Sequence, residues 1–330
     1  MTIKFNNVFV NGASTVTGPY ESNGPLSKFF DKSYEDLYMD TNTWEQAEIK
    51  ILGDSVEILL NKTKMIKEDI DLFISGDLLN QIVASNYTAS YLKLPYIGIY
   101  GACSTSVEGI ILGSSMLSNN QIKNCICSVS SHNTGAEKQF RNPTEYGAPK
   151  PKYSTFTCTG AGSLYLSNVK SDIKVESGTI GTTIDSGIKD VFNTGAVMAP
   201  SAADTIYRHL TDLKREPMYY DLIVTGDLGV YGKKILINYM QTEYGYDLSH
   251  NYDDCGVMLY DLEKQPVFAG ASGPAASALV TYSYIINKMK KGELSRVLMV
   301  ATGALMSQTT VNQKMAIPAV SHAVSLEVVE

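Results

Sequence analysis

A cysteine in a turn of small residues is the group in this chain best placed to do chemistry. Residues 101–106 read GACSTS; they follow an apolar run and precede a predicted helix. Small side chains allow a tight turn. Thr105 has capping-box spacing with Glu108, and Ser104 is a second candidate cap. Cys103 would then lie beside the free N–H groups of the first helical turn, where the helix dipole favours a thiolate and attracts anions. The turn predicts a nucleophile or an anion site, although a capped helix with a buried cysteine would give the same pattern.

Two further polar turns belong to an internal repeat. Residues 71–78 read DLFISGDL and residues 221–228 read DLIVTGDL, so five of eight positions are identical at an offset of 150. Each segment is a short apolar run that ends in Gly-Asp, as expected for a buried strand that leads into a functional turn. Further similar pairs follow in the same order: 8–16 with 173–180, 96–106 with 266–277, 125–130 with 297–302, and 158–166 with 320–328. The chain is therefore predicted to be a duplication.

The repeat also predicts the architecture that positions these turns. Each half reads as strand, helix, strand, helix, strand, helix and two final strands, which is typical of α/β folds. We expect two halves related by a pseudo-twofold axis, residues 1–170 and 171–330, with mixed, mainly parallel sheets covered by helices. Ligands of such folds bind at the carboxyl ends of the strands. The Gly-Asp turns and the cysteine turn should therefore meet there.

The cysteine turn and a second segment carry a resemblance to a known superfamily. GACST (101–105) after a buried strand resembles the nucleophile turn of the 3-oxoacyl synthase branch of the thiolase superfamily. CTGAGSLYLS (158–167) resembles the glycine-rich strand of that branch, which usually reads GDGAGA. With the duplicated halves, the resemblance covers essentially the whole chain. It implies a thiolase-like duplicated fold, and it opens the alternative of an acyl-transfer or 3-oxoacyl synthase-like enzyme that uses Cys103.

The chain departs from the synthase pattern at two functional positions. In such synthases a histidine follows the central strand of the second half, where residues 225–227 read Thr-Gly-Asp here. An asparagine usually lies in a Gly-Asn turn of the same half, where residues 270–273 read Gly-Ala-Ser-Gly. The two missing groups stabilise a developing oxyanion and assist proton transfer. The resemblance therefore argues against ordinary condensing activity.

Six longer segments, spread from end to end of the chain, carry a second and closer resemblance. They read GPLSKFFDKSYEDL (24–37), FISGDLLNQ (73–81), YGACSTS (100–106), SSHNTGAEKQFRNPTEYG (130–147), MAPSAADTI (198–206) and VLMVATGALMS (297–307). They resemble the stage V sporulation protein AD family of endospore-forming bacteria. This resemblance implies non-catalytic binding of dipicolinic acid, a pyridine dicarboxylic acid, or of its calcium chelate, for uptake into the developing spore. It also implies membrane proteins of the same sporulation operon as partners, and a soluble intracellular protein of sporulating cells that associates peripherally with the spore inner membrane.

A flat, doubly charged pyridine dicarboxylate selects particular candidate ligand-binding residues. It needs N–H and O–H donors, positive potential and an apolar slot for the ring. The helix start offers Cys103 together with the hydroxyls of Ser104 and Thr105. His322 lies where related thiolases bring an active-site residue from the final hairpin, and a protonated imidazole there would pair with a carboxylate; a core histidine is the other interpretation. His132 ends a predicted strand and is a second candidate.

Arg141 and Asp227 complete the candidate set, and each has a structural alternative. Arg141 can grip a carboxylate with two hydrogen bonds, or it can form a loop salt bridge with Glu137 or Glu145. Asp227 occupies the region of the lost histidine, but a carboxylate near a dianion is repulsive unless it is protonated or bridged by calcium. Capping of its own turn is the alternative for Asp227. His209 is expected on a helix surface.

Composition argues against several other classes of function. A formal net charge of -7 argues against nucleic-acid binding, which needs clustered Lys and Arg. No apolar run approaches the roughly 20 residues of a bilayer span.

The five cysteines have irregular spacings, which predicts free thiols in a reducing compartment. We expect no cofactor. We also expect no metal, because residues 250–255 lack a second ligand pair at metal spacing and are interpreted as a loop. A homodimer is expected by analogy with thiolases alone.

Overall fold

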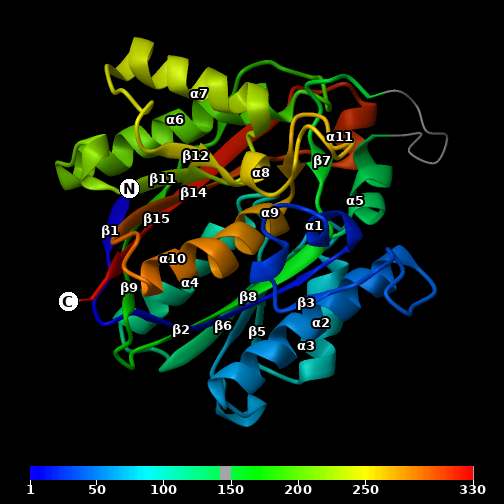
Figure 1. Cartoon of the computed structure of the whole chain (residues 1–330), viewed down its shortest axis with the longest axis vertical. Coiled ribbons are helices and arrows are strands. Elements are labelled where there is room, and N and C mark those ends of the chain that lie inside the picture. Colours follow the sequence, from blue (N-terminus) through cyan, green and yellow to red (C-terminus); the bar gives the residue numbers. More distant parts are fainter. Residues whose placement is uncertain (142–149, 330) are drawn as a thin grey trace.

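The computed structural model describes residues 1–141 and 150–329, and its main feature is one mixed sheet (Figure 1). The strand order along this sheet is β12-β11-β14-β15-β9-β2-β8-β6-β4-β5. The first half of the chain supplies β2 (Phe9–Thr17), β4 (Phe73–Gly76), β5 (Tyr96–Gly98), β6 (Asn124–Ser131) and β8 (Gly160–Ser167). The second half supplies β9 (Ile173–Ile180), β11 (Leu222–Thr225), β12 (Tyr252–Asp254), β14 (Arg296–Ala304) and β15 (Pro318–Val328). The halves meet where β2 lies beside β9.

In each half, four strands of this path run in one direction and one opposes them. In the first half β4 is parallel to β5 and β6, whereas β8 is antiparallel to both β6 and β2. In the second half β11 is parallel to β12 and β14, whereas β15 is antiparallel to both β14 and β9. The same pattern of directions in both halves confirms the expected duplicated α/β fold with mixed, mainly parallel strands.

Helices cover the sheet and fill the space between the halves (Figure 1). α2 (Trp44–Thr63) and α3 (Val83–Leu92) pack on the first half, and α6 (Thr194–Leu213) and α7 (Gly229–Tyr244) pack on the second. The central layer holds α4 (Thr105–Ser118) and a longer helix made of α9 (Pro274–Leu279), a π-helical segment (Val280–Ile285) and α10 (Ile286–Lys290). Buried residues of this central layer join strands of both halves in one large core. The amino ends of the central helices are therefore held firmly at the junction of the halves.

Short elements connect and extend these layers. The short strands are β1 (Thr2–Lys4), β3 (Lys32–Ser33), β7 (Phe156–Thr157), β10 (Ile184–Asp185) and β13 (Ala271–Ser272). The short helices are α1 (Pro19–Ser22), α5 (Asn133–Phe140), α8 (Cys255–Met258) and α11 (Gln308–Asn312), with 3-10 turns at Ser27–Phe29, Lys67–Asp69 and Pro217–Tyr219. β7 pairs with β13 and so joins a loop of each half. Across the described residues, every helix is too short or too polar to cross a bilayer.

The edge strand of the second half lies outside its predicted segment. Residues 250–255 were expected to form a loop, but β12 lies within them and pairs with β11 as β5 pairs with β4. Residues 266–270, the predicted counterpart of β5, run instead between α8 and β13. Val267 and Ala269 in this connection are buried at 0% and 2% exposure, so a buried loop has the apolar signature of a strand.

His209 also departs from its predicted position, because it is fully buried. Its Nδ1 lies 2.7 Å from Oγ1 of Thr179, and its Nε2 lies 2.6 Å from the hydroxyl of Tyr220. Burial is the main reason that the pKa of His209 falls to about 3. The polar pattern of α6 did not reveal that this face of the helix packs on β9.

Candidate functional site

Cys103 lies in the turn between β5 and α4, at the carboxyl ends of the parallel strands of the first half. Ala102 before it has a left-handed φ of 51°, which costs a non-glycine residue roughly 1 kcal/mol. The hydroxyl of Ser104 donates to the carbonyl of Gly101 at 2.6 Å, and the hydroxyl of Thr105 donates to the carbonyl of Ala102 at 2.6 Å. Neither hydroxyl caps α4. The capping prediction is therefore wrong, because both hydroxyls stabilise the strained turn instead.

The thiol of Cys103 is neutral rather than ionised at neutral pH. Burial, followed by the nearby charge of Asp227, raises the pKa of Cys103 well above its usual value. A hydrogen bond from the backbone of Gly273 acts in the opposite direction but is a smaller effect. The predicted thiolate is therefore wrong, because burial and a like charge outweigh the helix dipole. All five cysteines are free, as expected.

Asp227 is the carboxyl group that faces Cys103 from the second half. It follows β11 and is fully buried. Its Oδ1 accepts a hydrogen bond from the hydroxyl of Thr302 at 2.6 Å, and its Oδ2 accepts one from the N–H of Gly273 at 3.0 Å. A further hydrogen bond joins it to Cys103. Burial raises the pKa of Asp227 to about 7, so the carboxyl gains or loses its proton near neutral pH.

The turn that contains Ser272 and Gly273 completes this side of the site. Gly273 has a φ of +100°, and a Cβ there would lie 2.8 Å from the Oγ of Ser131. Both facts require glycine at this position. The two second-half turns that lack the synthase histidine and asparagine, at 225–227 and 270–273, thus contribute Asp227 and Ser272 to the surroundings of Cys103.

Arg141 brings positive charge from the first half. Its Nη1 donates to Oε1 of Glu137 at 3.2 Å and to the carbonyl of Thr155 at 2.7 Å. Lys150 forms an ion pair with the other oxygen of Glu137. The predicted salt bridge with Glu137 is therefore present, while Glu145 lies outside the described residues. Two cations thus share one carboxylate beside the site.

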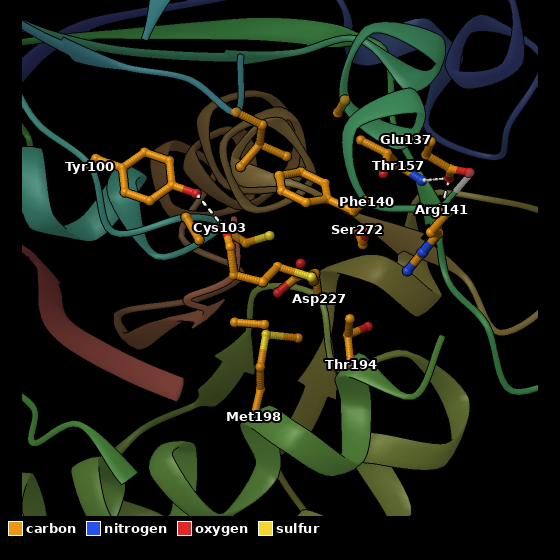
Figure 2. Close-up of a pocket in the computed structure, with 15 residues that line it drawn as sticks. Tyr100, Cys103, Glu137, Phe140, Arg141, Thr157, Thr194, Met198, Asp227 and Ser272 are labelled. Carbon is orange, nitrogen blue, oxygen red and sulfur yellow. Dashed lines mark hydrogen bonds and ion pairs between the residues drawn. The ribbon is translucent and has the colours of Figure 1, made fainter. Parts of the chain in front are cut away.

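These groups surround one cavity, which we call the Cys103 cavity (Figure 2). It has a volume of about 40 Å³. Its polar lining is Cys103, Glu137, Arg141, Thr157, Thr194, Asp227 and Ser272, and its apolar lining is Leu78, Tyr100, Ala102, Ala136, Phe140, Met198, Ala304 and Met306. In Figure 2, Tyr100 and Phe140 lie to the left and right of Cys103, and Met198 lies below it. The cavity therefore combines aromatic walls with a few polar groups, as small-molecule sites do.

A larger groove of about 410 Å³ adjoins the Cys103 cavity. The two share Leu78, Tyr100, Phe140 and Met306 as walls. The groove is formed by residues 78–82, 98–100, 139–140 and 306–309, all of them uncharged. The hydroxyl of Tyr100 donates to the carbonyl of Met306 at 3.4 Å, which joins the two halves at this boundary.

Comparison with known proteins identifies the family. The family profile of Stage V sporulation protein AD (SpoVAD) matches residues 1–327. The chain belongs to the stage V sporulation protein AD family. It is 46% identical over 320 residues to the Stage V sporulation protein AD of Bacillus subtilis (strain 168). The aligned residues cover 97% of this chain and 94% of that protein. Membership of the SpoVAD family places the protein in sporulation.

Solved structures confirm the thiolase-like fold of this SpoVAD family member. The 3-oxoacyl-[acyl-carrier-protein] synthase III of Aquifex aeolicus VF5 is 13% identical, with a TM-score of 0.59 over 97% of this chain and 99% of that one. A variant of OleA from Xanthomonas campestris is 13% identical, with a TM-score of 0.63 over 98% of this chain and 99% of that one. At such low identity the similarity establishes the fold alone.

The two predicted histidines do not line the Cys103 cavity. The Nδ1 of His132 accepts from the N–H of Gly135 at 3.3 Å and so caps α5. The Nδ1 of His322 accepts from the N–H of Gly181 at 3.2 Å. Burial lowers the pKa of His132, and it lowers the pKa of His322 to about 4. Both rings are neutral at neutral pH, so the predicted pairing of a protonated His322 with a carboxylate finds no support.

Thr157 and most of the apolar wall were not predicted from the sequence. Tyr100 lies three positions before Cys103 in the printed sequence and Thr157 directly precedes the CTGAGS segment, so proximity to the motifs gives a weak signal for them. Phe140, Met198 and Met306 reach the cavity from three different elements or their flanks. No local pattern marks these three residues, because their role arises from packing between the halves.

Proposed function

We propose that this protein binds dipicolinic acid, or its calcium chelate, without catalysis, for uptake into the developing spore. Membership of the sporulation family supports the biological setting. The observation that carries the non-catalytic part is the polar lining of the Cys103 cavity. The thiol there is neutral and adjoins a carboxyl, and none of the described lining residues is His or Lys. Such a site can hold an anion, but the carboxyl beside its thiol raises the thiol pKa, whereas a nucleophilic cysteine needs that pKa lowered.

The lining suits a flat dicarboxylate in both shape and charge. The rings of Tyr100 and Phe140 and the side chains of Met198 and Met306 offer apolar surface for a pyridine ring. The guanidinium of Arg141 provides a cationic donor for one carboxylate. The Cys103 cavity alone is small, at about 40 Å³. The proposal therefore requires the shared walls to shift, so that the ligand extends toward the adjoining groove.

Titration calorimetry with dipicolinate tests this proposal. We expect saturable binding that Met306→Trp abolishes, because the larger side chain would fill the boundary between cavity and groove. Met315→Trp is the matched control, since Met315 is 52% exposed and lines neither space. Absence of heat at millimolar ligand, or equal binding by both variants, would reject the proposed site.

Acyl transfer is the second candidate function, and one observation favours it. Cys103 opens into a cavity on a fold shared with 3-oxoacyl synthases. Incubation with acyl thioesters, followed by intact-mass analysis, should then reveal an adduct that Cys103→Ala removes. An unmodified mass with several thioesters would eliminate this candidate. The raised pKa of the Cys103 thiol predicts that outcome.

We also propose that the protein works with membrane proteins of its sporulation operon, at the periphery of the spore inner membrane. Family membership supports this setting. Fractionation of spores should find the protein with the inner membrane, and deletion of the operon's membrane proteins should release it. Recovery of the protein in the soluble fraction of broken wild-type spores would contradict the proposal. A homodimer is tested separately by the sedimentation coefficient of the purified protein.

A further inference from the structure

We propose that ligand binding in the Cys103 cavity is coupled to uptake of a proton by Asp227, an inference that rests on the proposed function. The reason is the position of Asp227. It lines the cavity that we propose holds the dianion, and its side chain is fully buried. A buried carboxylate beside a dianion is strongly unfavourable unless the carboxyl becomes neutral.

The hydrogen-bond partners of Asp227 carry no positive charge that could balance its carboxylate. Its direct partners are the hydroxyl of Thr302, the N–H of Gly273 and the thiol of Cys103. All three are neutral groups. Among the described residues, no Lys, Arg or His forms a salt bridge with Asp227. A proton is therefore the simplest counter-charge that this site can supply.

Other titratable groups near Asp227 do not replace it in this role. Asp254 raises the pKa of Asp227, and its own oxygens accept hydrogen bonds from Thr225, Leu228 and Gly229. Across the cavity, the carboxylate of Glu137 is paired with two cations. The remaining titratable neighbours are neutral at pH 6–8 because their pKa values are raised: Cys103, Cys158 and Cys255 around the carboxyl, and Tyr100 in the cavity wall.

The expected size of the coupling follows from the folded pKa of Asp227, which burial raises to about 7. The carboxyl is then half protonated at pH 7 in the free protein, and a neighbouring dianion shifts it toward the protonated form. Binding at pH 7 should take up about 0.5 proton per ligand. The affinity should fall about tenfold between pH 6 and pH 8, because the carboxyl of Asp227 loses its proton over this range. The aromatic carboxylates of the ligand are ionised throughout the range and add no pH dependence of their own.

Calorimetry of dipicolinate in calcium-free buffers of different ionisation enthalpy measures this uptake directly. Wild-type protein should show the uptake and the loss of affinity at high pH. Asp227→Asn, which keeps the shape but cannot ionise, should show neither. Glu21→Gln is the matched control: burial also raises the pKa of Glu21 to about 7, but Glu21 does not line the Cys103 cavity. That variant should retain the uptake.

The possible results distinguish the proton coupling from the proposed binding function. Saturable binding without proton uptake by the wild type would overturn the coupling while leaving the proposed function intact, and this measurement does not depend on the folding of a variant. Uptake that persists in Asp227→Asn would also overturn it. Binding that requires added calcium would assign the counter-charge to the metal rather than to a proton. No binding with or without calcium would instead reject the proposed function itself.

Discussion

Replacement of Arg141 by methionine should destabilise the protein far more than replacement of an exposed arginine. The side chains of Arg141 and Glu137 are 5% and 1% exposed. Arg141→Met leaves the carboxylate of Glu137 buried with Lys150 as its remaining cation. It also removes the donor to the carbonyl of Thr155. Loss of one partner from a buried ion pair costs about 3–5 kcal/mol, and the presence of Lys150 favours the lower value.

This free energy converts into a measurable change in the thermal midpoint. At ~2.1 cal/mol/K per residue, a chain of 330 residues has an unfolding entropy of about 0.7 kcal/mol/K. A loss of about 3 kcal/mol should therefore lower Tm by about 4 °C. Arg208 provides the control, because its pair with Asp204 has the same i,i+4 spacing but the arginine side chain is 44% exposed. Arg208→Met should shift Tm by less than about 1 °C.

Differential scanning calorimetry of three variants tests the reasoning. Adding Glu137→Gln to Arg141→Met removes a buried carboxylate that has lost one of its two cations, so the double variant should recover about 2 °C relative to the single one. A shift of less than 1 °C for Arg141→Met would refute the assignment of a buried ion pair. A double variant no more stable than the single one would show that the lost hydrogen bonds, not the buried charge, account for the effect.

Three further predictions concern the thiol, a buried carboxyl and the cysteine turn. Iodoacetamide should alkylate Cys103 more slowly than a free cysteine at pH 7.5. Asp227→Asn should accelerate the reaction, because the carboxyl of Asp227 raises the pKa of the thiol. Intact mass measured against time gives both rates. The pKa of Glu21 is raised from 4.5 to about 7, so the folded protein binds the proton more tightly and stability should fall as pH rises through this interval. The loss is roughly 3 kcal/mol, and urea unfolding of Glu21→Gln at pH 4 and pH 8 should show a smaller difference than wild type. Gly303→Ala should destabilise the folded protein by about 1–3 kcal/mol in the same assay, because the added Cβ would lie 2.2 Å from the carbonyl oxygen of Gly101 in the cysteine turn. Gly53→Ala is the control and should not destabilise it, because a Cβ there has no neighbour within 4 Å.

Repeated local patterns allowed the fold to be predicted from the sequence. α2 and α6 start 150 positions apart and both run for 20 residues. β4 and β11 lie in the two Gly-Asp segments. Apolar periodicity is a property of neighbouring residues, and it survives in a duplicated chain. The edge strand β12 escaped prediction because three residues of mixed polarity carry too little periodicity, while the buried connection near Val267 imitates a strand.

The sequence by itself determined the duplication, the place of Cys103 before a helix and the two second-half turns that meet it. The tertiary structure alone decided the ionisation of the site and the identity of its walls. Burial of Asp227 against Thr302 and Gly273 depends on contacts between residues 75 and 46 positions apart, and no local pattern encodes the resulting electrostatic environment. The same reason explains the histidines: their neutrality and their positions outside the cavity follow from what packs around them, not from their neighbours in the chain.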